Sequence, residues 1–260
     1  PSWLNSLPRS GSWMTNVKVT LGFLELALAL KFLSTADMVR HWEFLKYELF
    51  MGTWIILFLG LALYQFGFIR FAHDSKLKKI TSGRWVVGLL SLAFVAYLST
   101  GFYRPLSLLS GLAPPVHYSW WGPKSEKHDG PGCPHGLDCF HDFDEAVKAA
   151  QERNKPIFVD FTGFGCVNCR KMEETVWIQP DILKHLKEDY VVVSLYVDDQ
   201  ERIFPNDKQK CLIDKHNGQK LRTKGSKWGS FQVNNFGTSS QPYYALMGND
   251  GLKVLNPPVG

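Results

Sequence analysis

Two cysteines spaced three positions apart, in Cys166-Val-Asn-Cys169, can form a small disulfide ring. If they open a helix, unpaired backbone N–H groups and the positive end of the helix dipole stabilise a thiolate on the first cysteine. The second thiol lies one turn further on, partly shielded, and can resolve a mixed disulfide. We predict Cys166 as the nucleophile and Cys169 as the resolving thiol. Half of a zinc site and an inert pair are the alternatives, and the flanking elements decide between them.

The segments around the pair have the patterns of alternating helices and strands. Phe143 to Arg153 has the pattern of an amphipathic helix, with Asp142 as its N-cap. Ile157 to Thr162 is a short apolar run typical of a strand, and the segment 170–178 is helical in pattern. Tyr190 to Val197 is rich in β-branched residues and predicts a strand that is buried on both faces.

The remaining segments complete the series. A second short helix is predicted over 181–188, followed by a polar insertion over 199–227. Tyr243 to Met247 has a strand pattern, the Gly-Asn-Asp-Gly sequence at 248–251 is typical of a turn, and Leu252 to Leu255 continues as a second strand. The last two strands are therefore predicted to form a β-hairpin.

This order of elements predicts an α/β thioredoxin-like domain over 137–260. A final helix that would cover the sheet is missing from the pattern after Leu255, so we expect the domain to lack its last helix. The chain also starts at Pro1 rather than at a methionine. We therefore expect the sequence to be a piece of a longer protein.

Four more residues are candidates for the chemistry of the pair. Pro242 precedes a strand, and a cis peptide bond there would place the Gln241 backbone against the sulfurs; an ordinary trans proline is the alternative. Asp160 lies within an apolar strand, where burial near the thiols would raise its pKa and allow proton transfer. Glu173 follows Cys169 by one helical turn. A strand-end acid and a solvated helix face are the plain structural interpretations of these carboxylates.

The N-terminal part predicts a membrane domain over 1–104 with three transmembrane helices, at about 17–35, 49–71 and 85–103. Leu49 to Ile69 and Trp85 to Tyr103 contain no charged residue and no histidine, and each has roughly the 20 residues that a spanning helix needs. A connector rich in proline and glycine follows over 105–136.

The charges in the two loops predict the orientation. The first loop, 34–48, holds only the basic residues Arg40 and Lys46. The second loop, 70–84, holds five, namely Arg70, Lys76, Lys78, Lys79 and Arg84. Because basic loops favour the cytoplasmic side, the third helix runs outward and delivers the thioredoxin-like domain to the extracytoplasmic side. The predicted location of this domain is therefore the outer side of a membrane.

Composition excludes several classes of protein. The 260 residues are 45% hydrophobic, with a mean hydropathy of −0.12 and a net charge of +5. The chain is too polar on average to lie wholly within a membrane and too apolar to be disordered. Five cysteines are too few for a disulfide scaffold. A nucleic-acid partner is not expected, because the chain has no long basic run interleaved with aromatic residues.

Three cysteines lie outside the central pair. Cys133 and Cys139 have His135 and His141 interleaved with them. A structural disulfide is the favoured interpretation; a metal site with the histidines, an accessory redox pair and free thiols are the alternatives. Cys211 is unpaired by count and lies in the polar insertion, where it is either a free thiol or bonded to a part outside this chain.

The residues from Asp160 to Glu173, Asp-Phe-Thr-Gly-Phe-Gly-Cys-Val-Asn-Cys-Arg-Lys-Met-Glu, resemble the DsbD family of thiol:disulfide interchange proteins, which is related to CcdA. Four further stretches fit the same family. They are Pro-Ser-Trp-Leu-Asn at 1–5, Gly-Phe-Leu-Glu-Leu-Ala-Leu at 22–28, Tyr-Val-Asp-Asp at 196–199 and Gln-Pro-Tyr-Tyr at 241–244. The resemblance implies that this chain holds the last three transmembrane helices and most of the outer thioredoxin-like domain. It also implies a location in the bacterial inner membrane, with the thioredoxin-like domain in the periplasm.

The same resemblance implies electron flow from cytoplasmic thioredoxin, through a membrane cysteine pair, to the outer Cys-x-x-Cys. The implied acceptors are disulfide isomerases and thiols of cytochrome c maturation. Two departures matter. The three predicted spans contain no cysteine, so the chain needs the N-terminal part of the relay as a partner. Phe164 and Gly165 stand where many relatives have a tryptophan before the first cysteine.

The sequence therefore predicts a membrane-tethered protein-disulfide reductase, a thiol:disulfide oxidoreductase held in membrane lipid. It acts on extracytoplasmic thiol-disulfide proteins and receives electrons from cytoplasmic thioredoxin indirectly. No cofactor or catalytic metal is expected besides the redox-active disulfide Cys166–Cys169. Two alternatives stay open, a tethered thiol oxidase or isomerase and a non-catalytic metal-binding module that uses cysteines and histidines.

Overall fold

The computed structural model describes residues 12–71, 79–103, 106–121 and 133–260, which fall into two units. Several sequence predictions lie outside these residues. They concern the stretch 1–5, the loop residues Lys76 and Lys78, and the connector segment 122–132.

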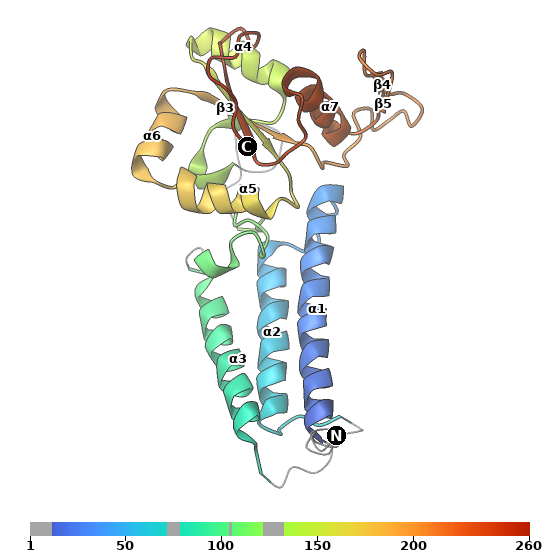
Figure 1. The fold of residues 1–260 in the computed structure, drawn as a ribbon, viewed down its shortest axis with the longest axis vertical. Helices are drawn as coiled ribbons and strands as arrows, with labels where there is room; N and C mark the ends of the chain where they lie inside the picture. The colour runs from blue at the N-terminus through green and yellow to red at the C-terminus, as the bar shows by residue number, and fades with distance from the viewer. Residues whose placement is uncertain (1–11, 72–78, 104–105, 122–132) are drawn as a thin grey trace, which may run out of the picture. The chain divides into compact units, whose positions relative to one another are not determined.

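The first unit contains three long apolar helices: α1 (Ser12–Arg40), α2 (Tyr47–Gln65) and α3 (Ser82–Thr100) (Figure 1). By length and composition, each is able to cross a membrane. The prediction of three such helices followed by an α/β domain is confirmed. Helix α1 extends beyond the expected 17–35, and its last residues, from Ser34 on, group with the second unit.

Arg84 lies within α3 and not in the preceding loop. Its Nε donates to the carbonyl oxygen of Gln65 at 2.9 Å, and its Nη2 donates to that of Tyr64 at 2.6 Å. These carbonyls lie in the last turn of α2, where the regular helical bonds run out, and that of Tyr64 also accepts the backbone N–H of Gly67 at 3.0 Å. The buried guanidinium therefore joins the ends of α2 and α3.

The second unit is built on a four-stranded sheet in the order β1-β3-β2-β6. Strand β3 pairs in parallel with β1 and β2, and β6 runs antiparallel to β2. The strands are β1 (Cys139–Phe140), β2 (Ile157–Thr162), β3 (Val191–Tyr196) and β6 (Tyr243–Met247). Strand β3 is buried at every position, as its apolar pattern predicts.

Helices cover both faces of this sheet (Figure 1). One face packs against α4 (Phe143–Arg153) and α7 (Lys224–Phe236). The other packs against the π-helical segment η4 (Glu173–Trp177) and α6 (Pro180–Glu188), with α5 (Val167–Met172) leading into η4. Because side chains alternate along a strand, the odd residues of β2 lie in the first core. The even ones, Phe158, Asp160 and Thr162, face α5 and η4.

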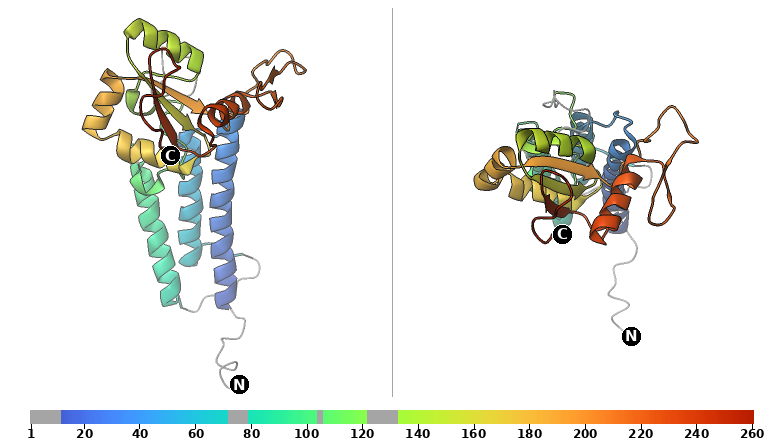
Figure 2. Two further views of the ribbon diagram at one scale, coloured as in Figure 1. Left: turned by 45° about the horizontal axis from the view of Figure 1, so that its top comes forward. Right: turned by 90° about the horizontal axis from the view of Figure 1, so that it is seen from above.

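Two regions differ from the sequence prediction. The polar insertion ends earlier than 227, because α7 begins at Lys224 with a capping box between Thr223 and Ser226. Before it, the strands β4 (Leu212–Ile213) and β5 (Lys220–Leu221) form a small hairpin that extends from the sheet beside α7 (Figure 2). The hairpin predicted over 243–255 is incomplete, since its second half forms only an isolated bridge from Val254 to Met247.

Gly225 is required where α7 begins, and replacing it by alanine tests the packing of that helix. A Cβ at Gly225 would lie 2.6 Å from backbone atoms of Asp199 and Val197, which cannot move aside independently. We expect Gly225→Ala to destabilise the second unit by about 2 kcal/mol, the usual cost of overpacking.

Gly229, one turn further along α7, is the matched control. A Cβ there meets no atom of the described residues within 4 Å. Gly229→Ala should therefore stabilise the unit by about 0.5–1 kcal/mol, because glycine is a poor helix former. Amide hydrogen exchange of β3 in the detergent-solubilised chain measures both changes. Equal effects of the two substitutions would contradict this packing.

Candidate redox-active site

Cys166 and Cys169 are joined by a disulfide at the start of α5, with their Cα atoms 5.3 Å apart. Cys166 is the N-cap of the helix, and its Sγ accepts a hydrogen bond from the Cys169 backbone N–H at 3.1 Å. Cys166 is half-buried, whereas Cys169 is only 1% exposed. The first sulfur is therefore the one that another protein can reach, and a thiolate there has a backbone donor already in place.

Asp198, at the end of β3, fixes the loop that leads to Cys166. Its carboxylate accepts backbone N–H bonds from Phe164 at 2.9 Å and from Gly165 at 2.8 Å. A Cβ on Gly163 would lie 2.9 Å from the same carboxylate, so a side chain there would push Asp198 away. Burial raises the pKa of Asp198, and the backbone bonds from Gly165 and Phe164 oppose this rise.

An open hollow lies beside the sulfur of Cys166. Its walls come from the loop before the pair, the first turn of α5, the end of β3 and the loop before β6. The lining residues are Gly163, Gly165, Cys166, Val167, Asn168, Val197, Asp198 and Gln241. The Gln241–Pro242 peptide bond is cis in the structure, and Gln241 lines the hollow beside Cys166; its role against the sulfurs stays a prediction.

Phe164 forms an aromatic contact on each side. Its ring stacks on Tyr196 with centroids 4.2 Å apart and forms a T-shaped pair with the His41 ring, with centroids 5.4 Å apart. His41 Nε2 also lies 2.8 Å from Asp199 Oδ1, and this carboxylate raises the pKa of His41. The segment between the first two long helices thus contacts the loop of the cysteine pair. Nothing in the sequence pattern indicated this contact.

A buried charge cluster lies under α5. Arg170 Nη1 forms an ion pair with Glu173 Oε2 at 2.8 Å, and its Nη2 donates to Thr162 Oγ1 at 3.2 Å. Asp160 is 1% exposed, and its Oδ2 has no hydrogen-bond partner among the described residues. Asp160 and Ser194 are paired neighbours on β2 and β3.

The two carboxyl groups of this cluster favour the protonated form. Burial, then the charge of Glu173, raises the pKa of Asp160 to about 8, although Arg170 opposes the rise. Burial also outweighs Arg170 at Glu173 and raises its pKa to about 7. A buried acid that titrates near neutral pH is suited to proton transfer. The structure thus brings Asp160 and Glu173 into one cluster with Arg170; their catalytic roles stay predictions.

The second cysteine pair lies on the same side of the sheet. Cys133 and Cys139 form a disulfide, with Cα atoms 6.0 Å apart. Between them, His135 Nε2 donates to the carbonyl oxygen of Glu173 at 2.7 Å. The disulfide loop therefore contacts the backbone beside the buried acid. Cys211 is a free thiol, partly exposed, in the insertion before α7.

Sequence reasoning missed two residues that shape this site, Arg170 and Asp198. The spacing of Arg170 and Glu173, three apart on a helix, is a recognisable ion-pair signal. The role of Asp198 has no local signal, because it depends on the end of β3 meeting a loop that is distant in sequence.

The sheet has parallel strands at its centre and helices on both faces, and a disulfide pair lies at the start of a helix near a cis-proline. These features define a thioredoxin-like protein with a redox-capable dithiol. Residues 138–216 match the thioredoxin-like family model.

Known proteins give the closer relationship. The chain is 26% identical over 191 residues to the thiol:disulfide interchange protein DsbD of Pseudoalteromonas atlantica, covering 68% of this chain and 28% of that protein. It is 24% identical over 189 residues to DsbD of Campylobacter jejuni, covering 73% and 29%. It is 24% identical over 214 residues to DsbD 1 of Pseudomonas aeruginosa, covering 81% and 32%.

These similarities confirm the predicted resemblance to the DsbD family, and they support a thiol:disulfide oxidoreductase. The chain spans about a third or less of the length of these relatives. What the relatives do as whole proteins is therefore a matter for proposal.

Proposed function

We propose that this chain is the membrane-tethered outer part of a protein-disulfide reductase. The observation that carries the proposal is the half-buried Cys166, N-cap of α5, bonded to the buried Cys169 beside an open hollow. Similarity to proteins named thiol:disulfide interchange protein supports the same chemistry.

The proposed reaction is a thiol–disulfide exchange in which electrons and protons balance. The Cys166 thiolate attacks a partner disulfide, forming a mixed disulfide and releasing one partner thiolate. The Cys169 thiolate then attacks the Cys166 sulfur, which releases the second partner thiol and closes the Cys166–Cys169 disulfide. Two electrons pass to the partner, and the partner thiols take up two protons. No cofactor is needed beyond the cysteine pair.

The direction is proposed from the burial of the second cysteine. A dithiol is a strong oxidant when its reduced, thiolate form is stabilised. Here Cys169 is only 1% exposed, and burial disfavours the charged form of a thiol. A thiolate that is not stabilised in this way favours reduction of partners. A reduction potential near that of strong oxidants would instead indicate the oxidase or isomerase alternative.

The membrane setting is part of the proposal. The three long apolar helices tether the thioredoxin-like unit to a lipid bilayer, and the basic residues between α2 and α3 favour a cytoplasmic location for that loop. The unit then lies in the periplasm of a bacterial inner membrane. It receives electrons from a membrane relay supplied by the N-terminal part of the protein, and from cytoplasmic thioredoxin behind it. Isomerases and cytochrome c maturation thiols are the proposed acceptors.

Trapping of the mixed disulfide tests the exchange step without the relay. In the full chain expressed in bacterial membranes, Cys169→Ala should accumulate covalent adducts that a reducing agent releases, because no thiol is left to resolve them. The Cys166→Ala/Cys169→Ala double variant is the control and should form none. If Cys169→Ala forms no adducts while the second unit is folded by amide hydrogen exchange, the exchange function is wrong.

A further inference from the structure

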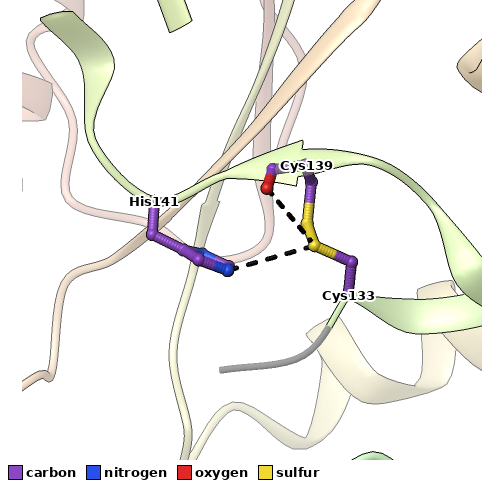
Figure 3. Close-up of side chains that lie close together, drawn as sticks. All are labelled: Cys133, Cys139 and His141. Carbon is purple, nitrogen blue, oxygen red and sulfur yellow. Dashed lines mark hydrogen bonds between the residues drawn. A yellow bond between two sulfur atoms is a disulfide. The ribbon is translucent and has the colours of Figure 1, made fainter. Parts of the chain in front are cut away.

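A second group of sulfur and nitrogen ligands lies on and beside β1: Cys133, Cys139 and His141 (Figure 3). The two Sγ atoms and one ring nitrogen of the histidine all lie within 4.8 Å of one another. The exchange reaction proposed above does not use these residues. Their types and their closeness in space are those of metal ligands as well as of a disulfide.

The hydrogen bonding of His141 determines which ring nitrogen faces the sulfurs. Its Nδ1 lies 3.3 Å from the carbonyl oxygen of Ser194. A carbonyl can only accept, so Nδ1 carries the proton, and in the neutral ring Nε2 carries the lone pair. Metal-binding histidines are commonly oriented by this type of bond from the other ring nitrogen.

The Nε2 atom points toward the sulfur pair, as Figure 3 shows, and lies 3.9 Å from Cys133 Sγ. Metal–sulfur bonds of about 2.3 Å and metal–nitrogen bonds of about 2.0 Å would place the two ligand atoms about 3.5–3.7 Å apart. This sulfur–nitrogen separation therefore needs only a small adjustment to bridge one ion. The two sulfurs, which are bonded to each other in the disulfide, must move to about 3.8 Å apart after reduction.

We propose that the reduced Cys133–Cys139 pair and His141 form a binding site for one thiophilic d10 cation of the Zn(II) and Cu(I) class. Two thiolates and one imidazole suit such ions, whereas hard ions prefer oxygen ligands. In the disulfide form the sulfurs carry no charge to bind a cation. The disulfide therefore closes the site, and reduction opens it.

Opening the site requires a dithiol as the reductant. The Cys133–Cys139 disulfide takes two electrons and two protons from that dithiol, which becomes a disulfide. Binding of the cation then releases both protons from the Cys133 and Cys139 thiols. The site thus couples metal binding to the thiol redox state around the unit.

The test uses the full chain in detergent with the other thiols removed. Cys166→Ser, Cys169→Ser and Cys211→Ser leave Cys133 and Cys139 as the remaining cysteines of the five. After reduction with a dithiol and removal of the reductant, Zn(II) is titrated against a chromophoric chelator, and Cu(I) against its own chelator. We expect one equivalent bound by the reduced protein and none by the same protein after oxidation. Failure of both ions to bind the reduced form overturns the proposal.

Co(II) in place of Zn(II) identifies the ligands directly. A thiolate-to-Co(II) charge-transfer band should appear in the reduced background, and Cys139→Ser should remove at least half of its intensity. His141→Gln should weaken Zn(II) binding by at least about tenfold. His185→Gln, a change on the exposed face of α6, should leave the affinity unchanged. An unaltered affinity in His141→Gln, or equal binding by the oxidised and reduced forms, contradicts the site.

Because this background lacks Cys166 and Cys169, its outcome is independent of the exchange function. A chain that traps partner disulfides but binds no cation keeps the proposed function and loses the metal site. A chain that binds one cation but traps no partner gives the opposite result.

Discussion

Asp160→Asn is expected to make the second unit more stable than the parent at pH 8, with the difference shrinking toward pH 5. The parent carboxyl is buried, and burial with the nearby Glu173 charge raises its pKa to about 8, from an ordinary value of 3.8. Between these two values the unfolded chain has lost a proton that the folded chain keeps, so the stability of the parent falls as pH rises. Asparagine has no proton to lose. We expect a gain on the order of 3 kcal/mol at pH 8.

The measurement is amide hydrogen exchange of β2 and β3 between pH 5 and pH 8, corrected for the intrinsic exchange rate. Asp250→Asn is the matched control in an exposed turn, where the carboxylate accepts the Leu252 N–H at 2.9 Å. These backbone bonds lower the pKa of Asp250. The contribution of Asp250 to the free energy of unfolding is therefore complete at neutral pH and is lost only as pH falls below about 4. Parallel profiles of the parent and Asp160→Asn would show that Asp160 is not a buried protonated acid.

A buried acid that costs stability at neutral pH needs a reason to be in this strand. At its position, an apolar residue would pack against α5 without a penalty. Asp160 keeps its proton near pH 7, and a buried acid of this kind can give a proton to a thiolate or take one from a thiol. We interpret the lost stability as the cost of keeping a proton within the site.

The central part of this fold is predictable because its signals are local. Strand β2 matches its predicted bounds of 157–162. Asp142 caps α4, accepting backbone bonds from Asp144 and Glu145. The cysteine pair comes directly after the strand, so its position at the helix start follows from chain order alone. Apolar alternation and capping residues are sufficient for these elements.

Helix α7 was missed because its composition opposes its structure. It contains Gly225 and Gly229 and several polar residues, so a propensity argument favours a loop. Its helical form depends on the Thr223–Ser226 capping box and on Trp228, which is buried in the core. A search for the cap, followed by Gly237 as the C-cap, would have found it.

Other parts of the site depend on contacts between distant segments. Asp198 reaches the loop at Phe164 and Gly165, and His41 reaches Phe164 from more than a hundred residues earlier. No periodicity or spacing encodes such pairs in a single sequence. The roles of these residues can therefore be recognised only in the folded structure.

Arg170→Met is expected to be the most destabilising of these substitutions, by about 4 kcal/mol at pH 8, the usual cost of leaving a buried charge without its partner. Arg170 is 4% exposed and neutralises Glu173 at 2.8 Å, and its positive charge also opposes the rise in the pKa of Asp160. Without it both carboxyls hold their protons more strongly. The loss should be smaller at pH 5, where both acids are already protonated, and urea denaturation of the solubilised chain at the two pH values measures it.

A double-mutant cycle separates the ion pair from the packing of the Arg170 side chain. Glu173→Gln removes the charge that Arg170 neutralises, so Arg170→Met/Glu173→Gln should lose less stability than the two single losses added, by at least about 1 kcal/mol. Arg153→Met is the comparison for an exposed pair, since Arg153 is half exposed and lies 3.1 Å from Asp138. That change should cost less than about 1 kcal/mol. Strict additivity in the Arg170–Glu173 cycle would mean that the guanidinium stabilises the unit only by packing and by its bond to Thr162. The ion pair with Glu173 would then contribute nothing to stability.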